Sequence, residues 1–426
     1  MISPDPYDAL ETRSPDAREH ALMHALALQV AHAQAAAPAF AASLAGIDAA
    51  QVTTRAALAR LPVLRKHELL ERQHAADAPD LFGGHATVGW GPVAAARRAL
   101  RVFESPGMLH EPEGRGSDYW RMARALHAAG LRGGDLVHNS FSYHFTPAGA
   151  MMESGAFALG CTVFPAGTGQ TEQQVRALAA CGSNAYIGTP SFLKILLEKA
   201  DSLGIALPTL TKASVGAEAF PPSLRDWLAA RGVMAYQSYA TADLGLIAYE
   251  TAAREGLVLD EDIIVEIVRP GTGEPLPEGE VGEVVVTTLN PDYPLIRFGT
   301  GDLSAILPGT CPTGRTQQRI RGWLGRADQT AKVRGMFVHP SQVAEIARRH
   351  PQVVRTRLVV SGAMAEDRLT LMAEVAGAGL PAVDGLAQRI AETVRDVTKL
   401  RAEVSLCAPG SLPNDGKVIA DERDYG

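Results

Sequence analysis

Residues 184–203 decide the fold: Asn184-Ala185-Tyr186-Ile187-Gly188-Thr189-Pro190 is followed by Ser-Phe-Leu-Lys-Ile-Leu-Leu-Glu-Lys-Ala-Asp-Ser-Leu. The short apolar run 184–188 predicts a strand. The longer run from Pro190 to Leu203 carries apolar residues at helical spacing and predicts a helix. A strand followed directly by a helix is the repeating unit of α/β proteins.

The same alternation extends to both sides of this stretch. We expect strands at 135–140, 161–165, 211–215 and 233–237, and helices at 118–129, 148–159, 171–180 and 222–230. Strands that alternate with helices of ten or more residues imply βαβ units and a mainly parallel sheet. From 257 to 289 the pattern changes to strand-like runs such as 263–268 and 282–286. Pro- and Gly-rich turns separate these runs and predict antiparallel pairing.

The two ends of the chain predict different structures. The first hundred residues read as helices joined by loops, including one over 17–42 that Pro38 breaks. After Gly325 a smaller α+β unit is expected, with helices at 340–349 and 384–399 and strands at 357–361 and 368–375. The predicted fold class is therefore α/β. A large N-terminal α/β domain (1–325) has parallel sheets and a small β-rich subdomain, and a small α+β lid domain (326–426) follows it.

Composition excludes several classes of protein. The 426 residues carry 40 Lys and Arg against 47 Asp and Glu, a net charge of 40 − 47 = −7, so the basic footprint of a nucleic-acid-binding protein is missing. Four cysteines without a CxxC pair do not predict a disulfide framework or a zinc knuckle. The first residues lack the pattern of a secretion signal, and no run of eighteen apolar residues predicts a membrane span. We expect a cytoplasmic protein without nucleic-acid or membrane partners.

The segment Tyr-Pro-Leu-Ile-Arg-Phe-Gly-Thr-Gly-Asp, residues 293–302, is the most informative for chemistry. Thr-Gly-Asp after an apolar run predicts a tight turn that exposes the carboxylate of Asp302 to a ligand. A carboxylate can accept hydrogen bonds from two vicinal hydroxyls, such as those of ribose. Capping of the turn by Asp302 is the alternative, with about equal weight.

Four further segments carry groups that could meet a ligand. Residues 214–218 and 236–243 follow predicted strands, and ligands of parallel sheets bind beyond the carboxyl ends of strands. Residues 325–335 are rich in Arg, Lys and Asp, a pattern more typical of a solvated loop. Residues 412–417 end in Lys417, and a single lysine on a loop is normally only exposed.

Taken in order, these segments resemble the adenylate-forming superfamily and, within it, the phenylacetate-CoA ligase family. The resemblance spans essentially the whole chain. It is carried by Tyr7-Asp8-Ala9-Leu10-Glu11, Leu61-Pro62-Val63-Leu64-Arg65-Lys66, Gly169-Gln170-Thr171-Glu172, Thr189-Pro190-Ser191, Gly216-Ala217-Glu218, Pro294-Leu295-Ile296-Arg297, Thr300-Gly301-Asp302, Gly325-Arg326-x-Asp328 and Lys332-x-Arg334-Gly335.

The resemblance implies a two-step reaction in which a carboxylic acid is adenylated by ATP with Mg²⁺ and the acyl group then passes to coenzyme A. Asp302 and Arg326 would hold the ribose. Lys417 would stabilise the developing charge, Asp243 stands where the family binds Mg²⁺, and Asp328 would be the hinge of the lid. The remaining nucleotide-binding positions implied by the resemblance are Gly216, Ala217, Glu218, Tyr239, Ala240, Thr241 and Lys332.

The acid pocket is predicted beyond two strand ends. We place Tyr143, His144 and Phe145 after the strand that ends near Asn139, and Gly167 after the next strand. Aromatic side chains beside glycine-rich backbone suit a flat aromatic acid such as phenylacetate. For His144, the alternative of a loop histidine without a binding role has equal weight.

The chain departs from the family in its phosphate loop. Residues 103–114, Phe-Glu-Ser-Pro-Gly-Met-Leu-His-Glu-Pro-Glu-Gly, lack the expected lysine and threonines. Three carboxylates, Glu104, Glu111 and Glu113, would repel a triphosphate. A second departure is that Cys311 has no other Cys or His near it, so no structural zinc is expected.

Three functions therefore stay open. The first is an aryl- or acyl-CoA ligase that makes an acyl-adenylate. The second is a non-catalytic protein that binds a nucleotide or an acyl-CoA, which the altered loop favours. The third is an adenylating enzyme with an amine or a carrier protein as acceptor. A homodimer is expected from base rates alone.

Overall fold

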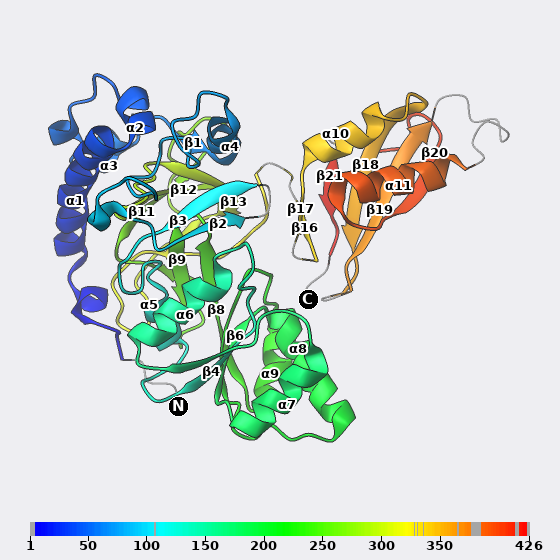
Figure 1. Ribbon diagram of the computed structural model, residues 1–426, viewed down its shortest axis with the longest axis horizontal. Coiled ribbons are helices and arrows are strands. Elements are labelled where there is room, and N and C mark those ends of the chain that lie inside the picture. Colours follow the sequence, from blue (N-terminus) through cyan, green and yellow to red (C-terminus); the bar gives the residue numbers. More distant parts are fainter. Residues whose placement is uncertain are drawn as a thin grey trace. The chain divides into compact units, whose positions relative to one another are not determined.

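The chain divides into two compact units, Met1–Gly325 and Arg326–Gly426, in the computed structural model (Figure 1). The structure describes residues 5–105, 108–327, 329, 331–334, 336–363, 366–375, 385–413 and 417–423. No helix among these residues is long and apolar enough to cross a membrane. The unit boundary coincides with the predicted domain boundary, while the roles of the two units stay a prediction.

A sheet of nine strands forms the centre of the first unit, in the order β14-β15-β10-β9-β8-β7-β6-β4-β5. Its parallel half consists of β4 (Leu136–Asn139), β5 (Thr162–Pro165), β6 (Ala185–Gly188), β7 (Lys212–Gly216) and β8 (Met234–Thr241). These strands run in register over mostly buried residues, and they bring the loops after β4, β5, β7 and β8 to one edge. The alternation predicted from sequence is confirmed here.

Helices cover both faces of these parallel strands. Figure 1 shows α7, α8 and α9 together on one side of β4 and β6, with α5 and α6 on the other. Their bounds are α5 (Met122–Ala128), α6 (Ala148–Ala158), α7 (Thr171–Cys181), α8 (Pro190–Leu203) and α9 (Pro222–Ala230). We expected α5 to begin at Asp118, but it begins four residues later, at Met122. The reason is that the Asp118 carboxylate accepts hydrogen bonds from the backbone N–H groups of Met122 and Ala123 and so caps the helix.

The other half of the sheet is antiparallel. It consists of β9 (Gly245–Glu250), β10 (Leu257–Leu259), β14 (Ile306–Leu307) and β15 (Arg319–Ile320). Strand β8 is longer than predicted, since it continues beyond Gln237 and pairs with β9 as far as Thr241. Tyr239, Ala240 and Thr241 therefore lie in a strand, where we expected a loop.

A second sheet has the order β1-β13-β12-β11. Its strands are β1 (Leu64–Arg65), β11 (Ile263–Val268), β12 (Gly282–Thr288) and β13 (Phe298–Ser304). The register of β12 against β13 shifts between Glu283 and Val285, where β13 carries extra residues. Asp302 lies at this irregularity and Gly301 has φ +73°, so the predicted tight turn is in fact a bulge inside a strand.

The N-terminal helices pack on this second sheet and share its hydrophobic core. They are α1 (Pro15–Ala36), α2 (Pro38–Ser43), α3 (Arg55–Leu58) and α4 (Lys66–His74), with short 3₁₀ turns at Ala9–Thr12, Ala49–Gln51 and Ala95–Arg97. The break at Pro38 is as predicted. An ion pair between Arg18 and Glu261 at 2.9 Å ties α1 to the loop before β11.

The segment predicted as the altered phosphate loop forms a hairpin of β2 (Arg101–Ser105) and β3 (Leu109–Glu113). Pro106 and Gly107, at its tip, lie outside the described residues.

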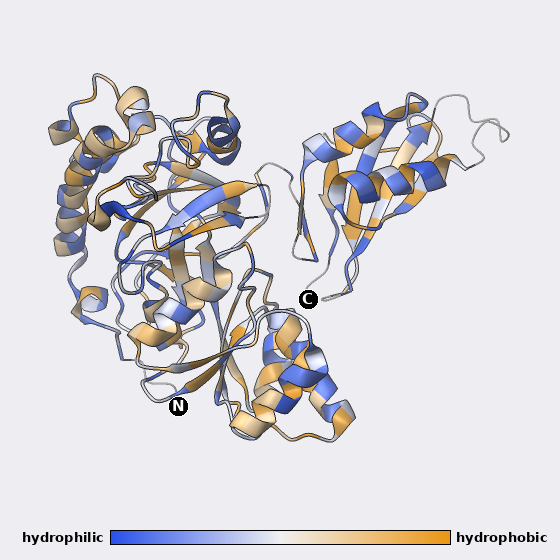
Figure 2. Cartoon of the chain, viewed as in Figure 1, coloured by the Kyte–Doolittle hydropathy of each residue, from blue (hydrophilic) through white to orange (hydrophobic). Residues whose placement is uncertain are grey.

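The second unit is a small α+β domain with its own core. Its four-stranded sheet has the order β20-β19-β18-β21, and β16 and β17 form a separate pair. The bounds are β16 (Ala331–Val333), β17 (Met336–Val338), α10 (Pro340–Arg348), β18 (Val353–Ser361), β19 (Arg368–Val375), α11 (Leu386–Thr398), β20 (Glu403–Cys407) and β21 (Ile419–Asp421). Figure 2 shows polar and apolar residues alternating along α10 and α11, which cover the sheet.

Candidate active site

The carboxylate of Asp302 is held by two side chains from different elements. Tyr239 Oη, on β8, donates to Asp302 Oδ2 at 2.8 Å, and Trp323 Nε1 donates to Oδ1 at 3.0 Å. Thr300 Oγ1 accepts from the backbone N–H of Asp302 at 3.1 Å. A buried carboxylate fixed at both oxygens is oriented before any ligand arrives.

Trp323 owes its position to a short antiparallel pairing. The backbone N–H of Leu303 donates to Gly325 O, and that of Leu324 donates to Leu303 O, both at 2.9 Å. This pairing lays residues 323–325 along the end of β13 and brings the indole beside Asp302. Sequence analysis did not single out Trp323, because no motif marks a side chain that is placed by backbone pairing.

The segment Gly216-Ala217-Glu218 continues from the end of β7. A Cβ on Gly216 would lie 3.0 Å from the backbone oxygen of Ser238, so glycine allows β7 and β8 to approach closely here. Ala217 has φ +67°, a left-handed conformation that is costly for a residue with a Cβ. Glu218 accepts from Ser191 Oγ at 2.5 Å, which fixes the start of α8 against this segment.

Asp243 lies in the turn between β8 and β9 and its side chain is 1% exposed. Lys66 Nζ, at the start of α4, is 3.1 Å from Asp243 Oδ2. Asp243 Oδ1 is buried without a hydrogen-bond partner. On β3 of the hairpin, the carboxyl of Glu111 is buried and its pKa is affected by the charges of Asp243 and Lys66.

Burial and the neighbouring charge of Asp243 raise the pKa of Glu111 well above its usual range. Glu111 Oε1 accepts from Ser105 Oγ at 2.5 Å, whereas Oε2 is buried without a partner. The single hydroxyl side chain in residues 103–114, that of Ser105, is thus directed at the Glu111 carboxyl. Unpartnered carboxylate oxygens are the donors that Mg²⁺ prefers, so the residues present fit a magnesium ion at Asp243.

Of the other two loop carboxylates, Glu113 is ion-paired with an arginine and Glu104 lies beside a histidine. Glu113 accepts from Arg101 Nη1 at 2.9 and 2.8 Å, and Glu104 lies 3.2 Å from His110 Nε2. The expectation that Glu104, Glu111 and Glu113 all repel a triphosphate is therefore too strong, because Arg101 neutralises Glu113.

The predicted acid-pocket residues come together beyond the ends of β4 and β5. Tyr143 Oη donates to Glu153 Oε2 at 2.9 Å and accepts from Asn139 Nδ2 at 2.8 Å. Phe145 is 77% exposed with φ +62°, and its backbone oxygen accepts from the N–H of Glu104 in the hairpin. The N–H of Gly167 donates to Asn139 O at 3.0 Å.

His144 is exposed, and its described contacts are backbone contacts with Ser142 and Thr146. These contacts fit the alternative of a loop histidine.

Three predicted residues belong to the second unit. Arg326 is its first residue, the half-buried Lys332 lies on β16, and Lys417 is exposed just before β21. Asp328, the predicted hinge, lies outside the described residues. The parts of Arg326, Lys332 and Lys417 in the site stay predictions.

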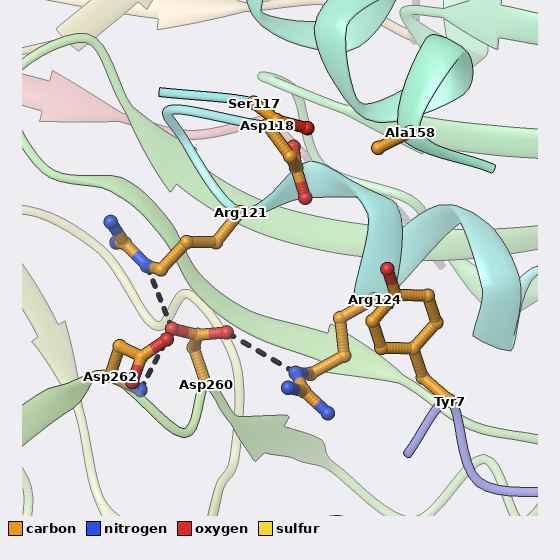
Figure 3. A pocket seen from close by; sticks show the side chains of 8 residues that line it. All are labelled: Tyr7, Ser117, Asp118, Arg121, Arg124, Ala158, Asp260 and Asp262. Carbon is orange, nitrogen blue, oxygen red and sulfur yellow. Dashed lines mark hydrogen bonds and ion pairs between the residues drawn. The ribbon is translucent and has the colours of Figure 1, made fainter. Parts of the chain in front are cut away.

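A polar cavity of about 320 Å³ lies at the N-terminal end of α5 and is drawn in Figure 3. Arg121 Nε donates to Asp260 Oδ1 at 2.8 Å, and Arg124 Nε lies 3.6 Å from Asp260 Oδ2. Arg124 also bonds Asp8 and Glu11 of the N-terminal segment. These ion pairs join the N-terminal segment to the sheet and indicate a structural role.

Comparison with known proteins shows the family of this chain. The model of a family described as AMP-binding enzyme matches residues 119–290. Phenylacetate-coenzyme A ligase from Thermus thermophilus is 32% identical over 68% of this chain and 71% of its own length. The chain belongs to the phenylacetate-coenzyme A ligase family. The ligase of the same name from Aromatoleum evansii is 29% identical over 96% of the chain and 94% of its own length.

The fold is that of the adenylate-forming enzymes. A 2-hydroxyisobutyryl-CoA ligase, solved in complex with 2-HIB-AMP and CoA, superposes with a TM-score of 0.81. It is 24% identical and covers 97% of this chain and 92% of its own length, and at this identity the likeness concerns the fold alone. Within the described residues, no group of three or more His, Cys, Asp and Glu side chains is arranged to hold a metal ion.

Proposed function

We propose that this chain is an ATP-dependent, AMP-forming ligase that joins an aromatic carboxylic acid of the phenylacetate type to coenzyme A. The observation that carries the proposal is the orientation of Asp302 by Tyr239 and Trp323, at distances of 2.8 and 3.0 Å. Membership of the phenylacetate-coenzyme A ligase family supports the reaction class. The aromatic nature of the acid rests on this family and on Tyr143 and Phe145.

The chain's own residues would act mainly by positioning and by charge. Asp302 would accept the ribose hydroxyls, and the backbone of Gly216 and Ala217 would lie against the adenine. Asp243 would hold Mg²⁺, which would supply positive charge beside the phosphates. Lys417 of the second unit would stabilise the charge that develops as the acyl-adenylate forms.

The altered loop supports a second candidate, a protein that binds a nucleotide or an acyl-CoA without catalysis. Ser105 donates to Glu111, and the sequence of the loop carries no lysine. Such a loop offers little to the β- and γ-phosphates of ATP.

Exchange of labelled pyrophosphate into ATP, with Mg²⁺ and a panel of aryl and short fatty acids, separates the two candidates. We expect exchange with one class of acid, strongest with phenylacetate-like acids, because the first half-reaction is reversible. Lys417→Ala should lower the exchange rate at least a hundredfold, since the cation that stabilises the developing charge is removed.

Lys199→Ala is the control, because Lys199 is a surface lysine of α8 paired with Glu172 at 3.3 Å. If folded protein gave no exchange with any acid, the binding-protein candidate would replace the ligase. If exchange occurred but coenzyme A did not accept the acyl group, an amine or a carrier protein would be the acceptor.

A further inference from the structure

A buried glutamine beside the predicted acid pocket uses its whole amide group in hydrogen bonds. Gln174, on α7, is 3% exposed. Its Nε2 donates to Gly167 O at 2.8 Å and to Gly169 O at 2.7 Å. Its Oε1 accepts from His138 Nε2 at 2.8 Å and from Ser140 Oγ at 3.2 Å. Both protons and both lone pairs of the amide are thus used between the end of β4 and the loop after β5.

The two carbonyl groups fix which way round the amide lies. Only the NH₂ end of Gln174 can face Gly167 O and Gly169 O, because an amide oxygen there would meet two acceptors. The amide oxygen therefore faces His138, whose Nε2 must carry a proton in order to donate. Burial lowers the pKa of His138, so the imidazole is neutral at neutral pH and its single proton lies on Nε2. Phe164 stacks on the imidazole, with 5.3 Å between the ring centroids, and holds its plane.

The loop that Gln174 holds is also held from β4. The backbone N–H groups of Ala166 and Gly167 both donate to Asn139 O at 3.0 Å. The side chain of Asn139, which is fully buried, donates to Tyr143 Oη at 2.8 Å. A continuous chain of contacts therefore runs from Gln174 through the loop and Asn139 to Tyr143, the aromatic residue predicted to line the acid pocket.

The conformation of this loop needs such support. Gly167 and Gly169 have φ values of +68° and +75°, and Gln170 has φ +50° although it carries a Cβ. A Cβ on either glycine would meet no described atom within 4 Å apart from its neighbours in the chain, so the loop borders on open space. Because nothing described packs on the loop at this side, the hydrogen bonds to Gln174 and Asn139 decide where it lies.

We propose that Gln174 is a positioning residue for the carboxylic acid. It fixes the loop 166–169, and the loop forms the wall against which the acyl group lies, so Gln174 acts without touching the substrate. The inference rests on the proposed function, because it takes the space beside Tyr143 and Gly167 as the place of the acid. It concerns affinity for the acyl group and leaves the binding of the nucleotide at Asp302 unchanged.

Calorimetric titration with two probes tests this role. One probe is AMP, and the other is phenylacetyl sulfamoyl-adenosine, an acyl-adenylate analogue that a thiol cannot open. Gln174→Met keeps the length of the side chain and removes its hydrogen bonds. It should weaken binding of the analogue about tenfold or more, because a displaced wall no longer fits the acyl group, and should change AMP binding less than about twofold. Gln174→Asn, whose shorter amide cannot reach from His138 to both carbonyls, should act in the same direction.

Gln29→Met is the matched control. Gln29 is 6% exposed, and its Nε2 also donates to two backbone carbonyls of one loop, Thr288 O at 3.0 Å and Asn290 O at 2.8 Å, beside the second sheet. The folded Gln29→Met protein should bind both probes as the unaltered protein does.

Three results would overturn the proposal. They are unchanged affinity of the Gln174→Met protein for the analogue, equal losses of affinity for AMP and for the analogue, and an unaltered protein that binds the analogue no more tightly than AMP. Since neither probe is turned over, absence of pyrophosphate exchange alongside Gln174-dependent binding of the analogue would count against the ligase function alone.

Discussion

At the scale of single residues, the contact between Trp323 and Asp302 matters most for ligand binding. The indole N–H donates to a carboxylate, and hydrogen bonds to charged groups contribute about 1.5–3 kcal/mol each. Asp302 is 9% exposed and Trp323 is 40% exposed, so the indole borders on solvent beside the group expected to bind ribose. Trp323 therefore orients Asp302, and we expect a nucleotide bound at Asp302 to change the surroundings of the indole.

We predict that AMP changes the intrinsic tryptophan fluorescence of the protein and that Trp323→Phe abolishes most of this change. The variant should also bind AMP about three- to tenfold more weakly, because a donor that orients Asp302 is lost. Fluorescence titration measures the first effect and calorimetry the second. Trp90→Phe, at a 55% exposed indole outside the site, is the control; an unchanged AMP signal in Trp323→Phe would contradict the prediction.

At the scale of elements, Arg297 joins three segments around the second sheet. Its side chain is 2% exposed, and it donates to Glu266 Oε2 on β11 at 2.9 Å. It also donates to Leu61 O at 2.6 Å and Gly273 O at 2.7 Å. The resemblance to the family marked Arg297 as a motif residue, and its contacts give it a structural role that holds β13, which carries Asp302.

Arg297→Met should lower the free energy of unfolding by about 3–5 kcal/mol, since Glu266 is left as an uncompensated buried charge. Adding Glu266→Gln should recover part of the loss. The exposed pair of Arg269 and Glu274 is the comparison, and Arg269→Met should cost less than about 1 kcal/mol. Denaturant unfolding measures these differences, and equal losses for the two arginine variants would refute the assignment.

At the scale of the whole molecule, buried carboxyl groups make stability depend on pH. Burial raises the pKa of Asp118 to about 6. Glu111, Glu113, Asp262, Glu266 and Asp292 shift in the same direction and for the same cause. At a pH between the pKa of such a group in the unfolded chain and its higher pKa in the folded chain, the folded chain binds more protons. The free energy of unfolding therefore falls as the pH rises through this range.

For Asp118 the window runs from about pH 4 to pH 6, and its share of the loss is on the order of 2 kcal/mol. Asp118→Asn removes the ionisation and keeps an oxygen to cap α5, so its unfolding free energy should fall less over this window. All four tryptophans, at 90, 120, 227 and 323, lie in the first unit, so their fluorescence follows its unfolding. Parallel pH profiles for the two proteins would contradict the prediction.

The elements of the parallel half follow from local sequence. The bounds of α8 and α9 match their predictions, and so do those of β11 in the second sheet, because apolar spacing, proline at a helix start and β-branched runs act within a few residues. The N-terminal break at Pro38 and the start of a new unit after Gly325 are local signals of the same kind. The order of the weak motifs also identified the family.

The tertiary structure decided how distant residues meet. The sequence showed Glu111 only as a charge that would repel phosphate, and folding of the hairpin buries it where the charge of Asp243 helps to raise its pKa. Trp323 reaches Asp302 through backbone pairing, and β8 extends to Thr241 because β9 folds back on it. Such contacts depend on register between separate strands, which the periodicity of one segment does not encode. The sequence thus determined the elements and the family, and the packing of strands decided which charges share the site.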